Sequence, residues 1–142
     1  NGETYGTEVS ATWQPKDVWR LRAGYSFLRV KLEPRSFKPS VGDADAASSP
    51  QQQAFLVSDM DLGRQVEWGL GLRWVDRLPL QGIRAYAELD ARLAWRPNPN
   101  CELAIIGRNL LDPHHREYAP NTITISNVEV DRAVYAKWTL RF

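Results

Sequence analysis

The chain contains few of the features that identify common enzyme and binding classes. Cys101 is the only cysteine among the 142 residues, so no disulfide can close within the chain. No set of cysteines and histidines has the spacing of a zinc site, and we interpret Cys101 as a small apolar side chain. The longest clean apolar run, 103–107, is far shorter than the roughly 20 residues of a membrane-spanning helix. If the chain meets a bilayer, we expect it to do so as strands.

Charge and catalytic motifs are equally sparse. Lys and Arg number 18 against 17 Asp and Glu, a formal net charge of +1 that gives no reason to expect a nucleic-acid partner. No nucleophile–base pair, glycine-rich phosphate loop or supported carboxylate pair is present, so we expect neither an enzyme nor a cofactor. The sequence begins at Asn1 without a signal peptide, and we expect any such segment to lie upstream.

The dominant pattern is alternation of apolar and polar residues with period two, which is typical of strands with two different faces. A sustained helical period of 3.6 is found nowhere. The pattern predicts an all-β protein with about seven strands, at 4–14, 19–31, 53–62, 66–77, 85–95, 101–110 and 132–142. Strands of this length suffice to cross a bilayer when they are tilted.

The last strand shows the alternation best. Its apolar side carries Val134, Ala136, Trp138, Leu140 and Phe142, and its other side carries Tyr135, Lys137, Thr139 and Arg141. The strand at 85–95 places Glu88, Asp90 and Arg92 opposite a run of Ala, Leu and Trp.

Some residues depart from the alternation. Phe55, Val57 and Ile106 fall on the polar side, and we expect a bulge near Asn109. Gly69 and Gly71 in mid-strand suggest that something packs closely against that side.

The connections alternate in length. Tight turns are expected at 15–17, 63–65 and 97–100, where Pro, Gly and Asn gather, and longer links at 33–52, 78–84 and 111–131. This order of short and long links indicates an antiparallel up-and-down meander with one trimmed end and one end that carries function.

The six tryptophans are distributed unevenly. Most of them lie on the apolar side near the short turns, where they would form an aromatic belt against lipid. The belt residues are Trp13, Trp19, Trp68, Trp95, Trp138 and the terminal Phe142.

The polar side is rich in charge, and such charges need water or a polar partner. A wide aqueous interior would supply it, and there Glu88, Asp90, Arg92, Lys137 and Arg141 would face the lumen. Solvent around a soluble sandwich or barrel would also supply it, which leaves that alternative open. In a bilayer two unpaired sheet edges are not tolerated, so we expect further strands before Asn1 to complete the barrel.

Four stretches resemble known signatures. The ending at 135–142, with its terminal Phe142, resembles the C-terminal signature of outer-membrane barrels. Residues 107–112, Gly-Arg-Asn-Leu-Leu-Asp, followed by Tyr118, resemble the stretch before the last strand of TonB-dependent receptors. Residues 2–8 and 86–92 resemble strand openings of the same family.

The resemblance spans residues 1–142 and implies the C-terminal part of a large transmembrane β-barrel, the last seven of about 22 strands. In that family a plug domain closes the barrel and the TonB complex energises uptake of a metal chelate such as a ferric siderophore. The implied location is the bacterial outer membrane, and the implied partners are its lipid, the TonB complex and the barrel assembly machinery, which reads the C-terminal signature. A passive pore, an autotransporter-type barrel and a soluble binding module remain alternatives.

Candidate ligand-binding residues lie in the long links. His114 and His115 have the side chains to touch a metal chelate, although such loop residues are more often merely solvated. Arg35 and Lys38 have the charge to attract an anionic chelate, offset by acidic neighbours. Asn109 and Asp112 fit a turn that ends a strand. No resident metal site is expected.

Overall fold

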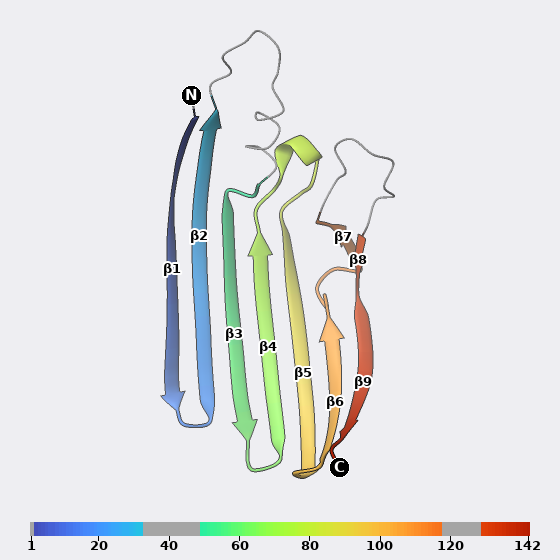
Figure 1. Ribbon diagram of the computed structural model, residues 1–142. Coiled ribbons are helices and arrows are strands. Elements are labelled where there is room, and N and C mark those ends of the chain that lie inside the picture. The colour runs from blue at the N-terminus through green and yellow to red at the C-terminus, as the bar shows by residue number, and fades with distance from the viewer. Residues whose placement is uncertain (1, 33–48, 118–128) are drawn as a thin grey trace.

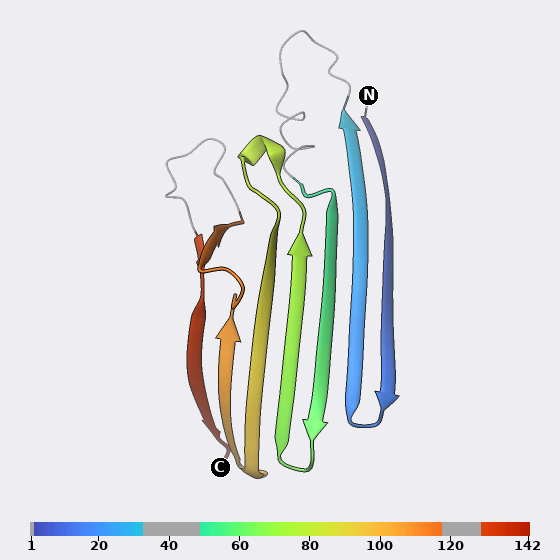
Figure 2. The same cartoon turned by 180° about the vertical axis from the view of Figure 1, so that it is seen from behind.

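The computed structural model describes residues 2–32, 49–117 and 129–142 and shows an all-β protein. Seven long strands form one sheet in the order β1-β2-β3-β4-β5-β6-β9, and every neighbouring pair is antiparallel. Figures 1 and 2 show these strands side by side in a single layer, with the other described elements gathered at its upper end. The strands are β1 (Gly2–Lys16), β2 (Trp19–Leu32), β3 (Gln52–Leu62), β4 (Val66–Val75), β5 (Tyr86–Asn98), β6 (Cys101–Arg108) and β9 (Ala133–Leu140).

The predicted meander of seven strands is confirmed, while several strand ends differ. The strand β1 runs through Pro15 and β5 through Pro97, and the register shifts after Trp13 and after Trp95. The turns themselves shrink to residues 17–18 and 99–100, whereas the third turn occupies 63–65 as expected, with Gly63 at a φ of 79°. β4 stops at Val75, before the short 3-10 helix η1 (Pro79–Gln81).

The strand β6 ends at Arg108 because the next residue leaves the extended conformation. Asn109 has a φ of 48°, in the left-handed region that Asn tolerates better than most residues. The Leu110 N–H donates to the Leu89 carbonyl, one residue out of step with the pairing of Ala91 and Gly107. Asn109 therefore acts as the one-residue bulge that the sequence predicts at this position.

The register aligns the alternating side chains of all seven strands into two continuous faces. One row, for example, contains Ala23, Leu56, Leu72 and Leu89. We call the side with the tryptophans the apolar face. The opposite side, which we call the polar face, carries Glu67, Glu88, Asp90, Arg92, Glu102, Arg108 and Lys137. Phe55, Val57 and Ile106 lie on the polar face, as the alternation predicts.

Few of the described side chains are buried, because a single layer has no interior of its own. One cluster, Val75, Leu78, Ile83 and Tyr86, lies at the long-link end, where η1 folds back through the bridge between Leu78 and Ile83. The other consists of Ala94, Ala104 and Ile106 on the polar face. Both are too small to stabilise a free-standing sheet of this size, so the fold depends on what covers its two faces.

Close packing against a mid-strand glycine occurs at a different place from the one predicted. A Cβ on Gly24 would lie 2.3 Å from the Phe55 ring, which therefore rests directly on that glycine. At Gly69 the nearest atom to an added Cβ would be Asp59 Oδ1 at 3.4 Å, and at Gly71 it would be Asp90 Cβ at 4.0 Å. Within the described residues, then, the face at Gly69 and Gly71 is open rather than packed.

A second small sheet interrupts the last long link, which the sequence suggested was a loop. It pairs β7 (His114–Arg116) with β8 (Glu129–Asp131) in antiparallel register. Figure 1 shows this sheet at the upper end of β6 and β9, away from the short turns. Strands of three residues are too short to leave an alternation signal, which is why the sequence did not predict them.

Candidate functional site

The apolar face is strongly exposed in this chain. Trp13 is 64% exposed, Trp95 47%, Trp138 66% and Leu140 46%, values that are unusual for large apolar side chains. Two indole N–H groups find protein partners: that of Trp19 donates to Ser58 Oγ at 3.0 Å and that of Trp138 to Cys101 Sγ at 3.4 Å. A surface of this composition needs an apolar environment to cover it.

The tryptophans follow a line that is inclined to the hydrogen-bonded rows. Val134 shares the row of Trp13, and Trp138 lies four residues farther toward the short turns (138 − 134 = 4). Four residues span about 13 Å along the strand, and six strand spacings span about 29 Å across the sheet. The tryptophans therefore form a level belt if the strands are tilted by roughly 25°. Continuing the line to Phe142 raises the tilt to roughly 40°, within the range of about 35–45° found in barrels.

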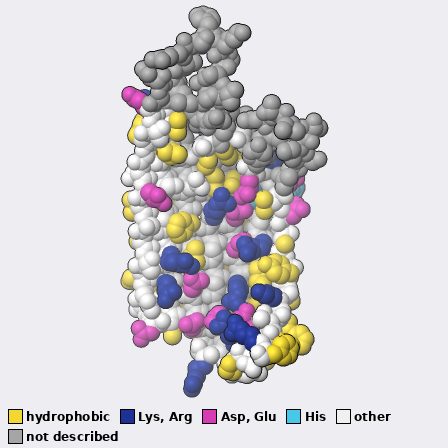
Figure 3. All heavy atoms as spheres, viewed as in Figure 1, with side chains coloured by type: hydrophobic (Ala, Val, Ile, Leu, Met, Phe, Trp, Pro, Cys, Tyr) yellow, Lys and Arg dark blue, Asp and Glu magenta, His cyan; other side chains and the backbone are white. Residues whose placement is uncertain are grey.

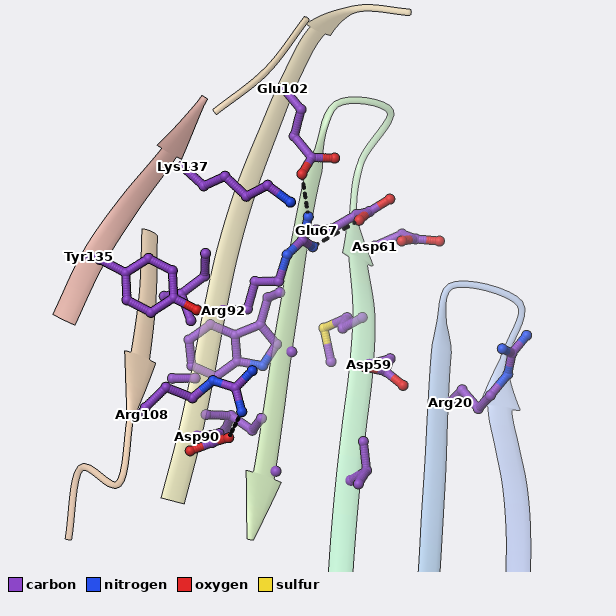
Figure 4. Close-up of a pocket in the computed structure, with 18 residues that line it drawn as sticks. Arg20, Asp59, Asp61, Glu67, Asp90, Arg92, Glu102, Arg108, Tyr135 and Lys137 are labelled. Atoms are coloured by element: carbon purple, nitrogen blue, oxygen red, sulfur yellow. Dashed lines mark hydrogen bonds and ion pairs between the residues drawn. The ribbon is translucent and has the colours of Figure 1, made fainter. Parts of the chain in front are cut away.

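The polar face carries a network of ion pairs near the short turns. Arg92 on β5 bonds Glu67 on β4 at 3.2 Å and Glu102 on β6 at 2.7 Å. Arg96 also bonds both carboxylates. Figure 4 shows Arg92 between its two partners. These side chains are partly exposed, so the pairs hold the strands in register while contributing little stability.

A groove of about 610 Å³ lies beside this network. Gly69 and Gly71 form part of its lining, together with Arg108 and Asp90, which are paired at 2.9 Å. Arg20, Asp61 and Lys137 also line it, and none of the three forms an ion pair with another described residue. Figure 3 shows basic and acidic side chains intermingled on this face. The groove thus offers both charge signs to a polar partner.

A second cluster lies at the long-link end of the polar face. The His115 ring stacks on Tyr86, with centroids 4.2 Å apart. Its Nε2 lies 3.4 Å from Glu88 Oε1 and 3.9 Å from Glu117 Oε1. Arg73 bonds both of these acids, Glu88 at 3.0 Å and Glu117 at 2.9 Å, and the Tyr86 hydroxyl donates to Glu117 at 3.1 Å.

Asn109 connects this cluster to the small sheet. The residue is 2% exposed, and its Nδ2 donates to the Val130 carbonyl of β8 at 3.1 Å and lies 3.3 Å from His115 Nδ1. Its backbone N–H donates to Asp90 Oδ1 on β5 at 3.0 Å. Through its side chain and its left-handed backbone, Asn109 therefore joins β5, β7 and β8.

The residues predicted from the sequence fall in different environments. His114 is exposed and its N–H donates to Asp112 Oδ1, whereas His115 is buried in the cluster just described rather than solvated. Arg35, Lys38 and Tyr118 lie outside the described residues. Glu88, Asp90, Arg92 and Lys137 share the polar face, and Arg141 and Phe142 follow the end of β9, where the Arg141 N–H donates to the Asn100 carbonyl.

Sequence reasoning did not single out Arg73, Tyr86 and Glu117 as members of a site. Arg73 and Glu88 are cross-strand partners, but the long link between β4 and β5 sets this register, and no tight turn predicts it. The sequence does not predict Glu117 as a member either, because the position of Glu117 depends on the fold of the last long link.

Comparisons with known proteins give one informative likeness. No protein-family profile and no curated protein matches the chain. The structure is similar to that of the siderophore receptor PiuA from Acinetobacter baumannii, with a TM-score of 0.70 and 22% identity. The match covers 97% of this chain and 22% of the receptor, so the chain spans about a fifth of the receptor's length. At this identity the likeness shows the fold, a segment of a β-barrel wall.

No helix among the described residues has the length and apolar character needed to cross a membrane.

Proposed function

We propose that residues 1–142 form the C-terminal part of the barrel wall of a TonB-dependent outer-membrane receptor that imports a metal chelate such as a ferric siderophore. The observation that carries the proposal is the contrast between the two faces of one uncovered sheet. An exposed aromatic face suits lipid, and an ion-paired face suits a wet lumen. The likeness to the barrel of a siderophore receptor supports the same function.

The groove on the polar face supports a plug as the partner inside the barrel. Arg20, Asp61 and Lys137 line it without an ion pair to another described residue, and the glycines leave room for a chain to approach. A plug can satisfy these charges and still slide or unfold, because exposed ion pairs are individually weak. The TonB complex would act on that plug, in a part of the protein that precedes this chain.

Ligand binding is assigned to the long-link end. His114 is exposed there, and Arg35 and Lys38 belong to the first long link, where positive charge would attract an anionic chelate. Along the last strand, Val134, Ala136, Trp138 and Leu140 form the apolar face and Phe142 follows them, and the barrel assembly machinery would bind this signature.

Uptake measurements test the transport function. We expect cells that lack the gene to lose uptake of radioactive iron carried by the siderophores that the bacterium itself secretes. Uptake should also cease when TonB is deleted or the proton gradient is collapsed, because no gradient of the scarce chelate drives its entry. A complemented strain should recover uptake.

A passive pore would behave differently. Its uptake would continue without TonB and would rise in proportion to external concentration without saturating. That result, or normal uptake of every secreted siderophore in the deletion strain, would contradict the proposed function.

A further inference from the structure

Three potential metal ligands converge at the long-link end of the polar face. They are Glu88 on β5, His115 on β7 and Glu117 just after β7, and one ligand atom from each lies within 4.8 Å of the others. Glu88 is distant in the sequence from the other two, and the fold brings them together by placing the small sheet against the upper end of the wall (Figure 1).

The histidine supplies an independent observation. The His115 side chain is only 7% exposed, and its Nε2 is buried without a hydrogen-bond partner. A buried polar nitrogen without a partner is costly, so its retention needs a reason. The nitrogen is aimed between two carboxylates, at 3.4 Å from Glu88 Oε1 and 3.9 Å from Glu117 Oε1.

We propose that Glu88, His115 and Glu117 bind a divalent first-row cation, for which Zn²⁺ is the probe. Imidazole nitrogen and carboxylate oxygen are ligands that zinc accepts, with bonds of about 2.0–2.2 Å. In a tetrahedral site such bonds place the ligand atoms about 3.3–3.6 Å apart. The His115–Glu88 distance of 3.4 Å already has this value, whereas the Glu117 carboxylate must turn, because its Oε1, 3.9 Å from Nε2, is held by Arg73 and Tyr86.

The surrounding residues can orient the ligands. Arg73 holds the second oxygen of Glu88 and, with the Tyr86 hydroxyl, one oxygen of Glu117, which leaves the other Glu117 oxygen for the cation. When Nε2 binds the metal, Nδ1 carries the ring proton and needs an acceptor. Asn109 Nδ2, a donor, lies 3.3 Å from Nδ1 without the metal, so the imidazole must shift toward Asp112 Oδ2, which lies 4.0 Å from Nδ1.

Charge also favours a cation here. Two carboxylates face one guanidinium and one imidazole, so with a neutral imidazole the cluster carries a formal charge of −1. Binding the cation would fasten β7 to β5 and so fix the start of the last long link relative to the wall. This site is separate from the cargo of the receptor and does not depend on the proposed transport function.

Zinc titration of the complete protein in detergent micelles tests the site. Calorimetry should find one Zn²⁺ bound per chain. His115→Gln and Glu88→Gln should each weaken the affinity for zinc at least about tenfold, because removing a ligand costs no less than removing an outer-shell partner. His114→Gln is the matched control, because that exposed neighbour should leave the affinity unchanged. Melting curves without zinc identify any variant that fails to fold.

A second readout distinguishes this site from zinc held elsewhere. Co²⁺ in place of Zn²⁺ should give the visible absorption of a nitrogen- and oxygen-ligated ion, and Glu117→Gln should change that spectrum. The proposal is overturned if folded His115→Gln binds zinc as tightly as the unaltered protein, or if only His114→Gln weakens binding. Absence of saturable zinc binding in the unaltered protein also overturns it.

Discussion

Arginine in place of Leu56 should lower the free energy of unfolding in lipid vesicles by about 2–4 kcal/mol, the cost of a cation near the middle of a bilayer. Leu56 is 46% exposed on the apolar face, in the row of Leu72 and Leu89. That row lies four residues from the row of Met60 and Trp68 (60 − 56 = 4), which belongs to the aromatic belt. The distance between the two rows is about 13 Å, about half the height of a 25 Å apolar band, so Leu56 lies near the middle of the band.

The matched control is the next residue along β3. Val57 lies on the polar face, across from Gly71 and Arg22, so Val57→Arg should change the free energy of unfolding by less than about 1 kcal/mol. Denaturant titration of the complete protein in vesicles, followed by tryptophan fluorescence, measures both. An equal loss in the two variants, or a larger loss at Val57, would mean that the faces are assigned the wrong way round.

The Asn109→Ala variant should lose about 2–3 kcal/mol of stability at the long-link end. Alanine at a φ of 48° costs about 1–2 kcal/mol, and the Val130 carbonyl loses its side-chain donor, which costs about another 1 kcal/mol. Because Asn109 joins β5, β7 and β8, the loss should appear mainly as opening of the small sheet.

Hydrogen exchange measures this opening directly. The amides of β7 and β8 should exchange faster in Asn109→Ala, while those of β3 and β4 stay protected. Asn109→Gly separates the two causes, since glycine accepts the positive φ and loses only the side-chain hydrogen bonds. We expect it to recover roughly half of the loss. Unchanged exchange in both variants would refute the role given to Asn109.

Much of the fold follows from local patterns in the sequence. A register error of one residue would turn every apolar side chain to the charged face, so the alternation in β4, β5 and β9 fixes both the strands and their faces. The glycine turn at 63–65 and the αL bulge at Asn109 are also local, and both are found where the sequence places them.

What the sequence did not predict depends on contacts between distant segments. Phe55 covers Gly24 because the two strands pair there, and the sequence of neither strand alone shows it. The small sheet brings His115 and Glu117 to Glu88 through pairing of three residues on each side. Residues 97–98 were expected in a turn because of Pro97, yet they continue β5 past a shift in register.

The sidedness of the sheet is tested most directly by spin labels on two adjacent residues of β9. Ala136 lies on the apolar face and Lys137 on the polar face. In the complete protein in a lipid bilayer, a label at 136 should be accessible to oxygen and shielded from a water-soluble nickel chelate, and a label at 137 should show the reverse. If the label at 136 meets the nickel chelate and the label at 137 meets only oxygen, the barrel-wall account is contradicted.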